Sequence, residues 1–371
     1  MTTLPTVAAV VVVRARSGKV MDSLETVRIA VVGAGVIGMS AVAALLDAGQ
    51  DVTCYESGSI MGERSVGSTR IFRLAHVDPD LVRLAQQARE GFDRWSELAG
   101  RPMLVNSECV ITGSDMAARA AAMATAGAHF ELVAAGSGRL RLPVVEEPAV
   151  ALVDAGGGVV DVDAAREHLT DRAGAVVVRD PVYALDVSAS GAAVVMSAGG
   201  KAEYDALILA AGTNTSHLAA QVGIYTPPLL AHHVRFTFSV EGDGWQSWID
   251  KPVDGVGTYQ HQSGPGRWAI GGHVDPSLTA WELGRDAAVE ASRAALLDYV
   301  RSRLMVEPTI VESVYCTTVP NLGDGVDFRR EGPVLAISGD NLMKFAPVLG
   351  EALSVASMNG STPAVDVSLP G

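Results

Sequence analysis

The segment Val27 to Glu56 constrains the fold of this chain more than any other. It reads VRIAVVGAGVIGMSAVAALLDAGQDVTCYE. Apart from Arg28, the first six residues are apolar, as a strand buried on both faces requires. A glycine turn, a helix from about Val36 to Ala48 and a second strand, Val52 to Tyr55, should follow. This order predicts the first unit of a doubly wound α/β fold.

The glycines of this segment have the spacing of a dinucleotide-binding turn. Gly33 permits a tight turn, Gly35 lets the backbone approach a pyrophosphate, and Gly38 allows close packing of helix on strand. The helix that follows directs its free N–H groups at the phosphate. Glu56 is placed to bind ribose hydroxyls, which disfavours NADP. The motif alone leaves FAD and NAD open, and a glycine-rich turn without a ligand is the alternative.

Composition limits the partners of the chain. It has 371 residues, 48% hydrophobic and 19% charged, with a net charge of −14. This acidic balance disfavours nucleic acids and anionic membranes as partners, and no apolar run is long enough to span a bilayer. The three scattered cysteines form neither a disulfide framework nor a zinc pattern, so we expect no metal and a reducing cytoplasm. A monomer or small homo-oligomer is expected.

The chain alternates between two styles of sequence. We expect a discontinuous Rossmann-like nucleotide-binding domain with an inserted α+β substrate domain built on an antiparallel sheet. The first domain takes residues 26–100, 151–225 and 306–371, and the second takes 101–150 and 226–305. Residues 1–25 should be a flexible extension, with Met21 as a plausible natural start. NAD dehydrogenases rarely return to the nucleotide domain this often, whereas flavoproteins commonly do.

Two further features bear on a site. The polar loop from Ser57 to Thr69 is long enough to suggest a function, and it delivers Arg70 and Arg73 to one place. The apolar strand Ala206 to Ala211 runs into Gly212, where a second cofactor contact would lie in a doubly wound fold.

These residues resemble the D-amino-acid-oxidase-type (DAO) family of FAD-dependent oxidoreductases, and within it the monomeric sarcosine oxidase and N-methyltryptophan oxidase group. The resemblance covers residues 27 to about 360. It is carried by VVGAGVIG with Glu56, by GSTRIFRLAH (67–76), by IGGH (270–273) and by KFAPVLGEAL (344–353). It implies FAD as cofactor, and bound FAD would be contacted by Gly33, Gly35, Val36, Ile37, Gly38, Glu56, Ser68, Thr69, Arg70, Val182, Ala211, Gly212, Cys316, Asn341, Leu342, Met343 and Lys344.

The resemblance also implies the catalytic residues. Arg70 would lie beside the flavin ring, Arg73 and Lys344 would hold a substrate carboxylate, and His273 would be an active-site histidine. A guanidinium fork suits a planar carboxylate, and fixed positive charge stabilises a flavin that gains electrons. Tyr259 and His261, on a strand of the substrate domain, are further candidates for the pocket lining.

Two positions depart from the family. The oxidases carry a lysine that activates oxygen four residues before the histidine, and here that position is Ala269, with Arg267 nearby. The family also links a cysteine to the flavin in a C-x-Y-T context. Here the segment reads SVYCTT, so Tyr315 aligns Ser313 with the linkage position, and Cys316 reaches it only in a slipped register. Covalent and non-covalent FAD both stay open.

The activity implied is oxidation of a small secondary or cyclic amino acid, such as an N-methyl or pipecolate-like amino acid, to an imine. Hydride would pass to flavin N5 and the electrons to oxygen. The alternatives are the same oxidation by a dehydrogenase that uses another acceptor, and a non-catalytic flavin-binding or subunit-type protein.

Overall fold

The computed structural model describes residues 26–105, 108–226, 230–319 and 325–363. The extension predicted for residues 1–25 therefore lies outside the described residues. One half of the molecule is built on a six-stranded sheet in which the five strands other than β19 are parallel. Across the sheet these are β19 (Val326–Glu331), β20 (Val334–Gly339), β13 (Ala206–Leu209), β1 (Arg28–Val32), β2 (Asp51–Glu56) and β9 (Val177–Arg179).

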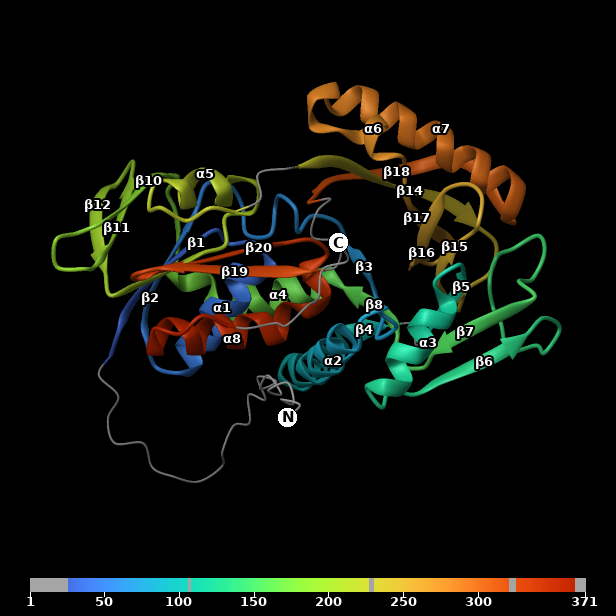
Figure 1. The fold of residues 1–371 in the computed structure, drawn as a ribbon, viewed down its shortest axis with the longest axis horizontal. Helices are drawn as coiled ribbons and strands as arrows, with labels where there is room; N and C mark the ends of the chain where they lie inside the picture. Colours follow the sequence, from blue (N-terminus) through green and yellow to red (C-terminus); the bar gives the residue numbers. More distant parts are fainter. Residues whose placement is uncertain (1–25, 106–107, 227–229, 320–324, 364–371) are drawn as a thin grey trace, which may run out of the picture.

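Both faces of this sheet are covered, which explains the apolar strands. Ile29 and Val31 of β1 pack with the helices on one face, and Ala30 and Val32 pack on the other. The first face carries α1 (Val36–Asp47), α4 (Val162–Ala173), α8 (Ala346–Asn359) and, further out, α2 (Pro79–Ala99). The second carries α5 (Thr215–Ala220) and a small sheet of β10 (Val182–Val187), β11 (Ala193–Ser197) and β12 (Gly200–Tyr204) (Figure 1).

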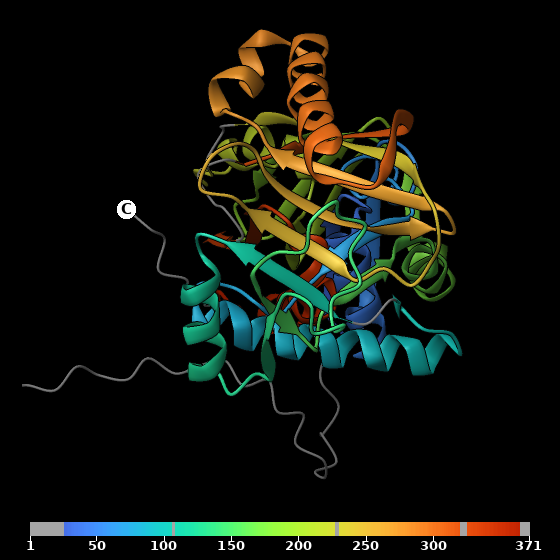
Figure 2. The same ribbon diagram turned by 90° about the vertical axis from the view of Figure 1, so that its right-hand side faces the viewer.

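The other half is built on an eight-stranded, mostly antiparallel sheet. Its order is β18 (Val306–Thr318), β14 (Ala231–Val240), β17 (Arg267–His273), β16 (Gly257–Gly264), β15 (Ser247–Lys251), β5 (Cys109–Gly113), β7 (Val150–Asp154) and β6 (Phe130–Ala134). The helices α6 (Pro276–Thr279) and α7 (Arg285–Arg303) lie on its outer face, and α3 (Met116–Thr125) lies near its other end (Figure 2). The predicted α/β fold with an inserted antiparallel sheet is confirmed.

A third small sheet lies at the junction of the two halves. It consists of β3 (Thr69–Phe72), β8 (Gly158–Asp161) and β4 (Leu104–Val105). β3 carries Arg70, so this arginine lies on a strand and not on the loop that the sequence suggested. The reason is tertiary pairing: residues 69–72 are too short to show a strand period, and they become a strand by pairing with β8.

β18 differs from the predicted division of the chain. Residues 306–371 were predicted to belong to the nucleotide-binding domain, but β18 pairs with β14 from Val306 to Thr318 and so belongs to the eight-stranded sheet. The chain returns to the six-stranded sheet at β19. Among the helices of the described residues, none combines the length and apolar composition of a membrane span.

Candidate functional site

A cavity of about 1490 Å³ lies between the two large sheets. On one side it is lined by the carboxyl ends of β1, β2, β13 and β20, through residues such as Gly33, Glu56 and Gly212. On the other it is lined by the eight-stranded sheet, including Tyr259 and Cys316. The carboxyl ends of parallel strands are where doubly wound folds bind nucleotides. We call this space the central cavity.

The three glycines of the first turn serve different purposes. Gly33 has φ +103°, and a Cβ there would lie 2.4 Å from the carbonyl oxygen of Ala210. A Cβ on Gly38 would lie 1.9 Å from the carbonyl oxygen of Gly33. Both glycines are therefore required by the fold itself. At Gly35, however, a Cβ would meet only Ser65 Oγ, at 3.5 Å, so the protein alone tolerates a side chain.

The polar groups around this turn fit the ADP half of FAD. Gly35 and the amino end of α1 border the central cavity. A Cβ on Gly35 would therefore occupy space that a bound pyrophosphate needs. The backbone N–H of Val36 donates to Ser65 Oγ at 3.0 Å. Glu56 is held at the end of β2 because Ala34 N donates to Oε2 at 2.8 Å and Gly58 N donates to Oε1 at 2.7 Å. A carboxylate fixed at the second strand is what ribose hydroxyls need.

Alanine substitutions should separate these purposes. We expect Gly35→Ala to reduce FAD affinity at least about tenfold through steric exclusion while the apoprotein unfolds at nearly the wild-type temperature. Gly38→Ala should lower the stability of the apoprotein as well, because its Cβ meets backbone. FAD titration and thermal unfolding of both apoproteins would test this. Equal loss of apoprotein stability in the two variants would contradict it.

Most of the residues predicted to contact FAD line the central cavity. These are Gly33, Gly35, Val36, Ile37, Glu56, Arg70, Val182, Ala211, Gly212, Cys316, Asn341, Leu342, Met343 and Lys344. Gly38, Ser68 and Thr69 are not among the lining residues of the described chain. Gly38 lies under the turn, and Ser68 and Thr69 turn their carbonyl oxygens to Val162 N and to arginines.

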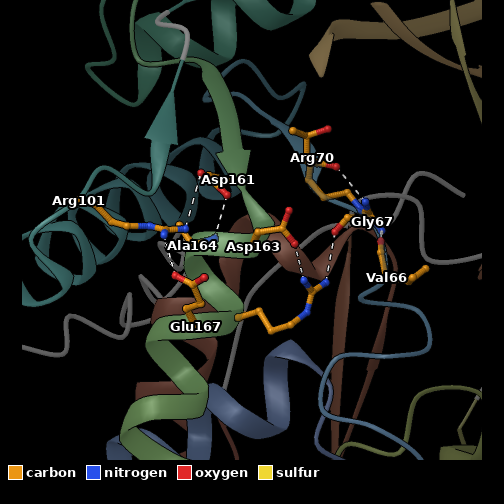
Figure 3. Close-up of polar contacts among 10 residues, drawn as sticks. Val66, Gly67, Arg70, Arg101, Asp161, Asp163, Ala164 and Glu167 are labelled. Atoms are coloured by element: carbon orange, nitrogen blue, oxygen red, sulfur yellow. Dashed lines mark hydrogen bonds and ion pairs between the residues drawn. The ribbon is translucent and has the colours of Figure 1, made fainter. Parts of the chain in front are cut away.

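Arg70 is oriented by the loop that precedes it. Its guanidinium donates to the carbonyl oxygen of Thr69 at 2.9 Å. It also donates to the carbonyl oxygen of Val66, as Figure 3 shows. Gly67 allows this close approach, since a Cβ there would lie 3.0 Å from Arg70 Nη1. Carbonyl oxygens hold the guanidinium without neutralising its charge, so the cavity wall keeps a fixed positive charge.

Arg73 and Lys344 bring two nearly buried cations to the central cavity. Arg73 is 9% exposed, and its Nε donates to the carbonyl oxygen of Ala75 at 3.2 Å. Lys344 is 3% exposed and lies in the 3-10 helix η4 (Leu342–Phe345) that follows β20. Asn341 starts this helix with φ +53°, a left-handed conformation that asparagine tolerates. The structure thus brings together residues that are 271 positions apart (344 − 73).

Asp154 supports the turn that carries Arg73. This carboxylate is fully buried and accepts hydrogen bonds from the backbone N–H groups of Leu74 at 2.6 Å, Ala75 at 3.0 Å and Gly156 at 3.0 Å. Burial raises the pKa of Asp154 to about 6, against the opposing effect of those N–H groups and of Arg73. Asp154 was not predicted from the sequence, where it is one acid among many.

The IGGH segment is explained by its two glycines. A Cβ on Gly271 would lie 2.1 Å from Tyr259 Cζ, so Gly271 leaves room for the tyrosine ring on the cavity side of the sheet. A Cβ on Gly272 would lie 2.8 Å from a methyl group of Leu296, which packs from α7. His273 follows at the end of β17, exposed and on the cavity wall.

Tyr259 forms a pair with His233, a residue that was not predicted from the sequence. The tyrosine hydroxyl and His233 Nε2 are 2.8 Å apart, and the two rings stack. Burial, with His273 and Arg70 adding to it, lowers the pKa of His233 to about 4, and burial raises the pKa of Tyr259. Both side chains are therefore uncharged at neutral pH. The signal in the sequence was weak, because His233 is one of two adjacent histidines in a strand.

His261 lies behind the cavity wall and not in it. It is fully buried, its Nε2 is 3.0 Å from Thr69 Oγ1 and 3.5 Å from Arg235, and it does not line the cavity. The expectation that it lines the pocket is therefore not met. Arg235, which is 4% exposed, donates to the carbonyl oxygen of Thr69 at 2.6 Å. These side chains join β14 and β16 to β3 and hold the Arg70 strand in place.

Ala269 lies on the same face of the sheet as His261, because the two are paired residues of β17 and β16. It is fully buried. Arg267, the nearest basic residue in the sequence, is 54% exposed in its side chain and lies 3.9 Å from Glu312 at the outside of the sheet. Arg267 therefore does not replace the lysine that the family's oxidases carry.

Cys316 lines the central cavity, and Ser313 does not. The two are on opposite faces of β18, since Cys316 pairs with His233 and Ser313 pairs with Phe236. Burial raises the pKa of the Cys316 thiol, while Arg70 and Arg64 oppose the rise. Arg64 is itself fixed 3.2 Å from Asp340 Oδ1 and donates to the carbonyl oxygen of Thr317 at 3.0 Å.

Residues 28–355 match the family model described as DAO, FAD dependent oxidoreductase. The chain belongs to this family. It is an FAD-dependent oxidoreductase, and the family resemblance seen in the sequence is confirmed. No curated protein sequence matches the chain significantly.

Solved structures of this family share the fold across nearly the whole chain. NikD, an unusual amino acid oxidase essential for nikkomycin biosynthesis, is 18% identical over 92% of this chain and 96% of its own, with a TM-score of 0.78. L-proline dehydrogenase from P. horikoshii is 16% identical over 93% and 96%, with a TM-score of 0.73. Glycine oxidase from Geobacillus kaustophilus is 18% identical over 92% and 97%, with a TM-score of 0.72. At these identities the likeness concerns the fold.

Proposed function

We propose that this DAO family member oxidises a small secondary or cyclic amino acid, such as an N-methyl or pipecolate-like amino acid, to an imine. The observation that carries the proposal is the pair of nearly buried cations, Arg73 and Lys344, in the cavity that also holds the dinucleotide turn. Bound FAD would supply the oxidising chemistry by accepting a hydride from the substrate carbon. NikD, proline dehydrogenase and glycine oxidase are named for amino acid substrates, which agrees with the proposal.

Arg73 and Lys344 would bind the substrate carboxylate. A guanidinium fork and an ammonium group that approach from different elements can fix both the position and the plane of a carboxylate. Since the side chains are already buried and held by the fold, little ordering is needed when the substrate binds. This anchor would place the amine end of the substrate toward Tyr259 and His233.

The uncharged Tyr259–His233 pair and the positive charge around it would favour the neutral amine. A protonated amine would be repelled by Arg70, Arg73 and Lys344. Loss of hydride from the carbon requires the nitrogen lone pair, so the neutral form is the reactive one. Arg70, with the exposed His273, would keep the electrostatic potential of the wall positive where the cofactor gains electrons.

The position of Ala269 favours a second candidate, a dehydrogenase that passes its electrons to an acceptor other than oxygen. Neither Ala269 nor the outward Arg267 brings an ammonium or guanidinium to the cavity at this point. The resemblance implies that the family's oxidases use a lysine at this position to activate oxygen, so its absence favours another electron acceptor.

A turnover assay with a panel of N-methyl and cyclic amino acids tests the proposal and separates its two forms. An oxidase should produce hydrogen peroxide in equal amount to the oxidised product. A dehydrogenase should reduce an artificial dye under nitrogen and give little peroxide in air. Turnover of amines without a carboxylate, but not of amino acids, would overturn the proposal.

Cys316 is proposed as the point of covalent attachment of FAD, because it lines the cavity and Ser313 does not. We expect the wild-type protein to keep its yellow colour in the pellet after acid precipitation, and Cys316→Ser to release FAD to the supernatant. Ser313→Ala should behave as wild type and serves as the control. Release of FAD from the wild-type protein would show that attachment is non-covalent.

A further inference from the structure

A second group of charged residues lies at the substrate end of the central cavity. Arg119 of α3 is 4% exposed, and Nη2 lies 2.7 Å from Asp115 Oδ2. Lys251, the last residue of β15, lies 2.8 Å from the same carboxylate oxygen. Arg119 and Lys251 both line the cavity. Neither residue belongs to a motif identified in the sequence.

The fold builds this group from two neighbouring chain segments. β5 runs beside the end of β15, and Ser114 N donates to the carbonyl oxygen of Lys251 at 2.8 Å. Gly113 makes this approach possible, because it has φ +99° and a Cβ there would lie 1.9 Å from that same oxygen. α3 begins directly after this turn and directs Arg119, one turn of helix beyond Asp115, into the cavity.

The group is adjacent to the proposed carboxylate anchor. Arg119 Nη1 donates to the carbonyl oxygen of Ala75 at 2.5 Å, and Arg73 Nε donates to the same oxygen at 3.2 Å. Two guanidinium groups that share one acceptor are close neighbours. A ligand carboxylate held by Arg73 would therefore have Arg119 within reach of its next few atoms.

The charges of this group are not balanced. Burial alone would raise the pKa of Asp115, but Arg119 and Lys251 outweigh that effect and lower it to about 2, so Asp115 is ionised. One carboxylate thus faces two cations. Arg119 Nε is buried and has no hydrogen-bond partner among the described residues.

We infer that the substrate carries a second anionic group, so that it is an amino acid with an acidic side chain. The α-carboxylate would bind to Arg73 and Lys344, and the side-chain anion would bind to Arg119 and Lys251. This inference rests on the proposed function and specifies its substrate class. A simple helical ion pair between Arg119 and Asp115 would leave the charge of Lys251 without a counter-charge and Arg119 Nε without a hydrogen-bond acceptor. A second anion would supply both the counter-charge and the acceptor.

Binding of unreactive acids to the FAD-loaded enzyme tests the inference without turnover. Glutarate and its monocarboxylate counterpart pentanoate are titrated while the visible absorbance of the flavin is followed. We expect glutarate to bind the wild type at least about tenfold tighter than pentanoate, the effect of one charge-assisted contact. Arg119→Met should remove this preference and leave the affinity for pentanoate unchanged. Lys251→Met, at a less buried position, should reduce the preference in the same direction.

Arg301→Met is the matched control, since Arg301 is 60% exposed in its side chain on α7 and pairs with Asp298. It should keep the wild-type preference for glutarate. Equal binding of the two acids by the wild type, or equal weakening of both by Arg119→Met and Lys251→Met, would overturn the inference while the proposed function stands. If neither acid perturbs the flavin, the carboxylate site itself is absent and the proposed function falls with it.

Discussion

Replacing Arg73 by leucine is expected to raise the apparent KM for an amino acid substrate by about a hundredfold or more, because one partner of a buried charge pair is removed. Arg73 is 9% exposed and lines the same cavity as Lys344. Leucine approximates part of the buried side-chain volume but offers no donor. Steady-state kinetics over a wide range of substrate concentration would measure the effect.

The methyl ester of the same substrate gives the control for this prediction. The wild type should prefer the free acid strongly, and Arg73→Leu should lose most of that preference because the ester has no charge for Arg73 to bind. Arg94→Leu, which removes an exposed arginine paired with Glu351 on the surface, should change neither constant. If Arg73→Leu keeps the wild-type ratio of acid to ester, Arg73 does not bind the carboxylate.

Replacing Asp154 by alanine is expected to lower the free energy of unfolding by about 3 kcal/mol or more and to impair substrate binding. The carboxylate accepts hydrogen bonds from three backbone N–H groups, two buried and one half-buried, and each buried group would lose its partner at about 1 to 3 kcal/mol. The turn from Arg73 to Ala75 would then lose its support. Denaturant unfolding and FAD-loaded substrate titration would measure the two effects.

Asp180 offers a matched comparison for Asp154. Its carboxylate also accepts hydrogen bonds, from Ser197 Oγ at 2.6 Å and Gly199 N at 3.0 Å, but it is half-buried and joins the turn after β9 to the β11–β12 hairpin, not to the turn that carries Arg73. Asp180→Ala should lower stability by about 1 kcal/mol and leave substrate affinity unchanged. A similar loss of stability in both variants would mean that Asp154 has no special structural role.

The dinucleotide half of the site was predictable because its signals are local. The residues from Val27 to Glu56 contain their own strand, turn, helix and strand, and Gly33 and Gly38 have steric reasons within that unit or next to it. The bounds of α1 and β2 were predicted to within one residue for the same reason. The resemblance to the DAO family then located Arg70, Arg73 and Lys344 from short motifs.

The substrate half was not predictable from local patterns. Its residues come from four separate elements: Arg119 from α3, Lys251 from β15, His233 from β14 and Asp154 from β7. The pairing of β5 with β15 and with β7 brings most of these elements together. The strand β3 was not predicted, because its four residues gain a strand conformation only by pairing with β8. His261 was predicted to line the cavity but lies behind its wall. Strand alternation indicates which face of the sheet a side chain lies on, but not whether other side chains separate it from the cavity.

The most direct test of the central claim is anaerobic reduction of the FAD-loaded protein by a candidate substrate. We expect an N-methyl or cyclic amino acid to bleach the visible absorbance of the flavin rapidly after mixing in a stopped-flow instrument. Its methyl ester should bleach the flavin much more slowly at the same concentration. This result requires both the cofactor in the cavity and the carboxylate at Arg73 and Lys344. Equal bleaching by acid and ester, or none by any amino acid in the panel, would contradict the account.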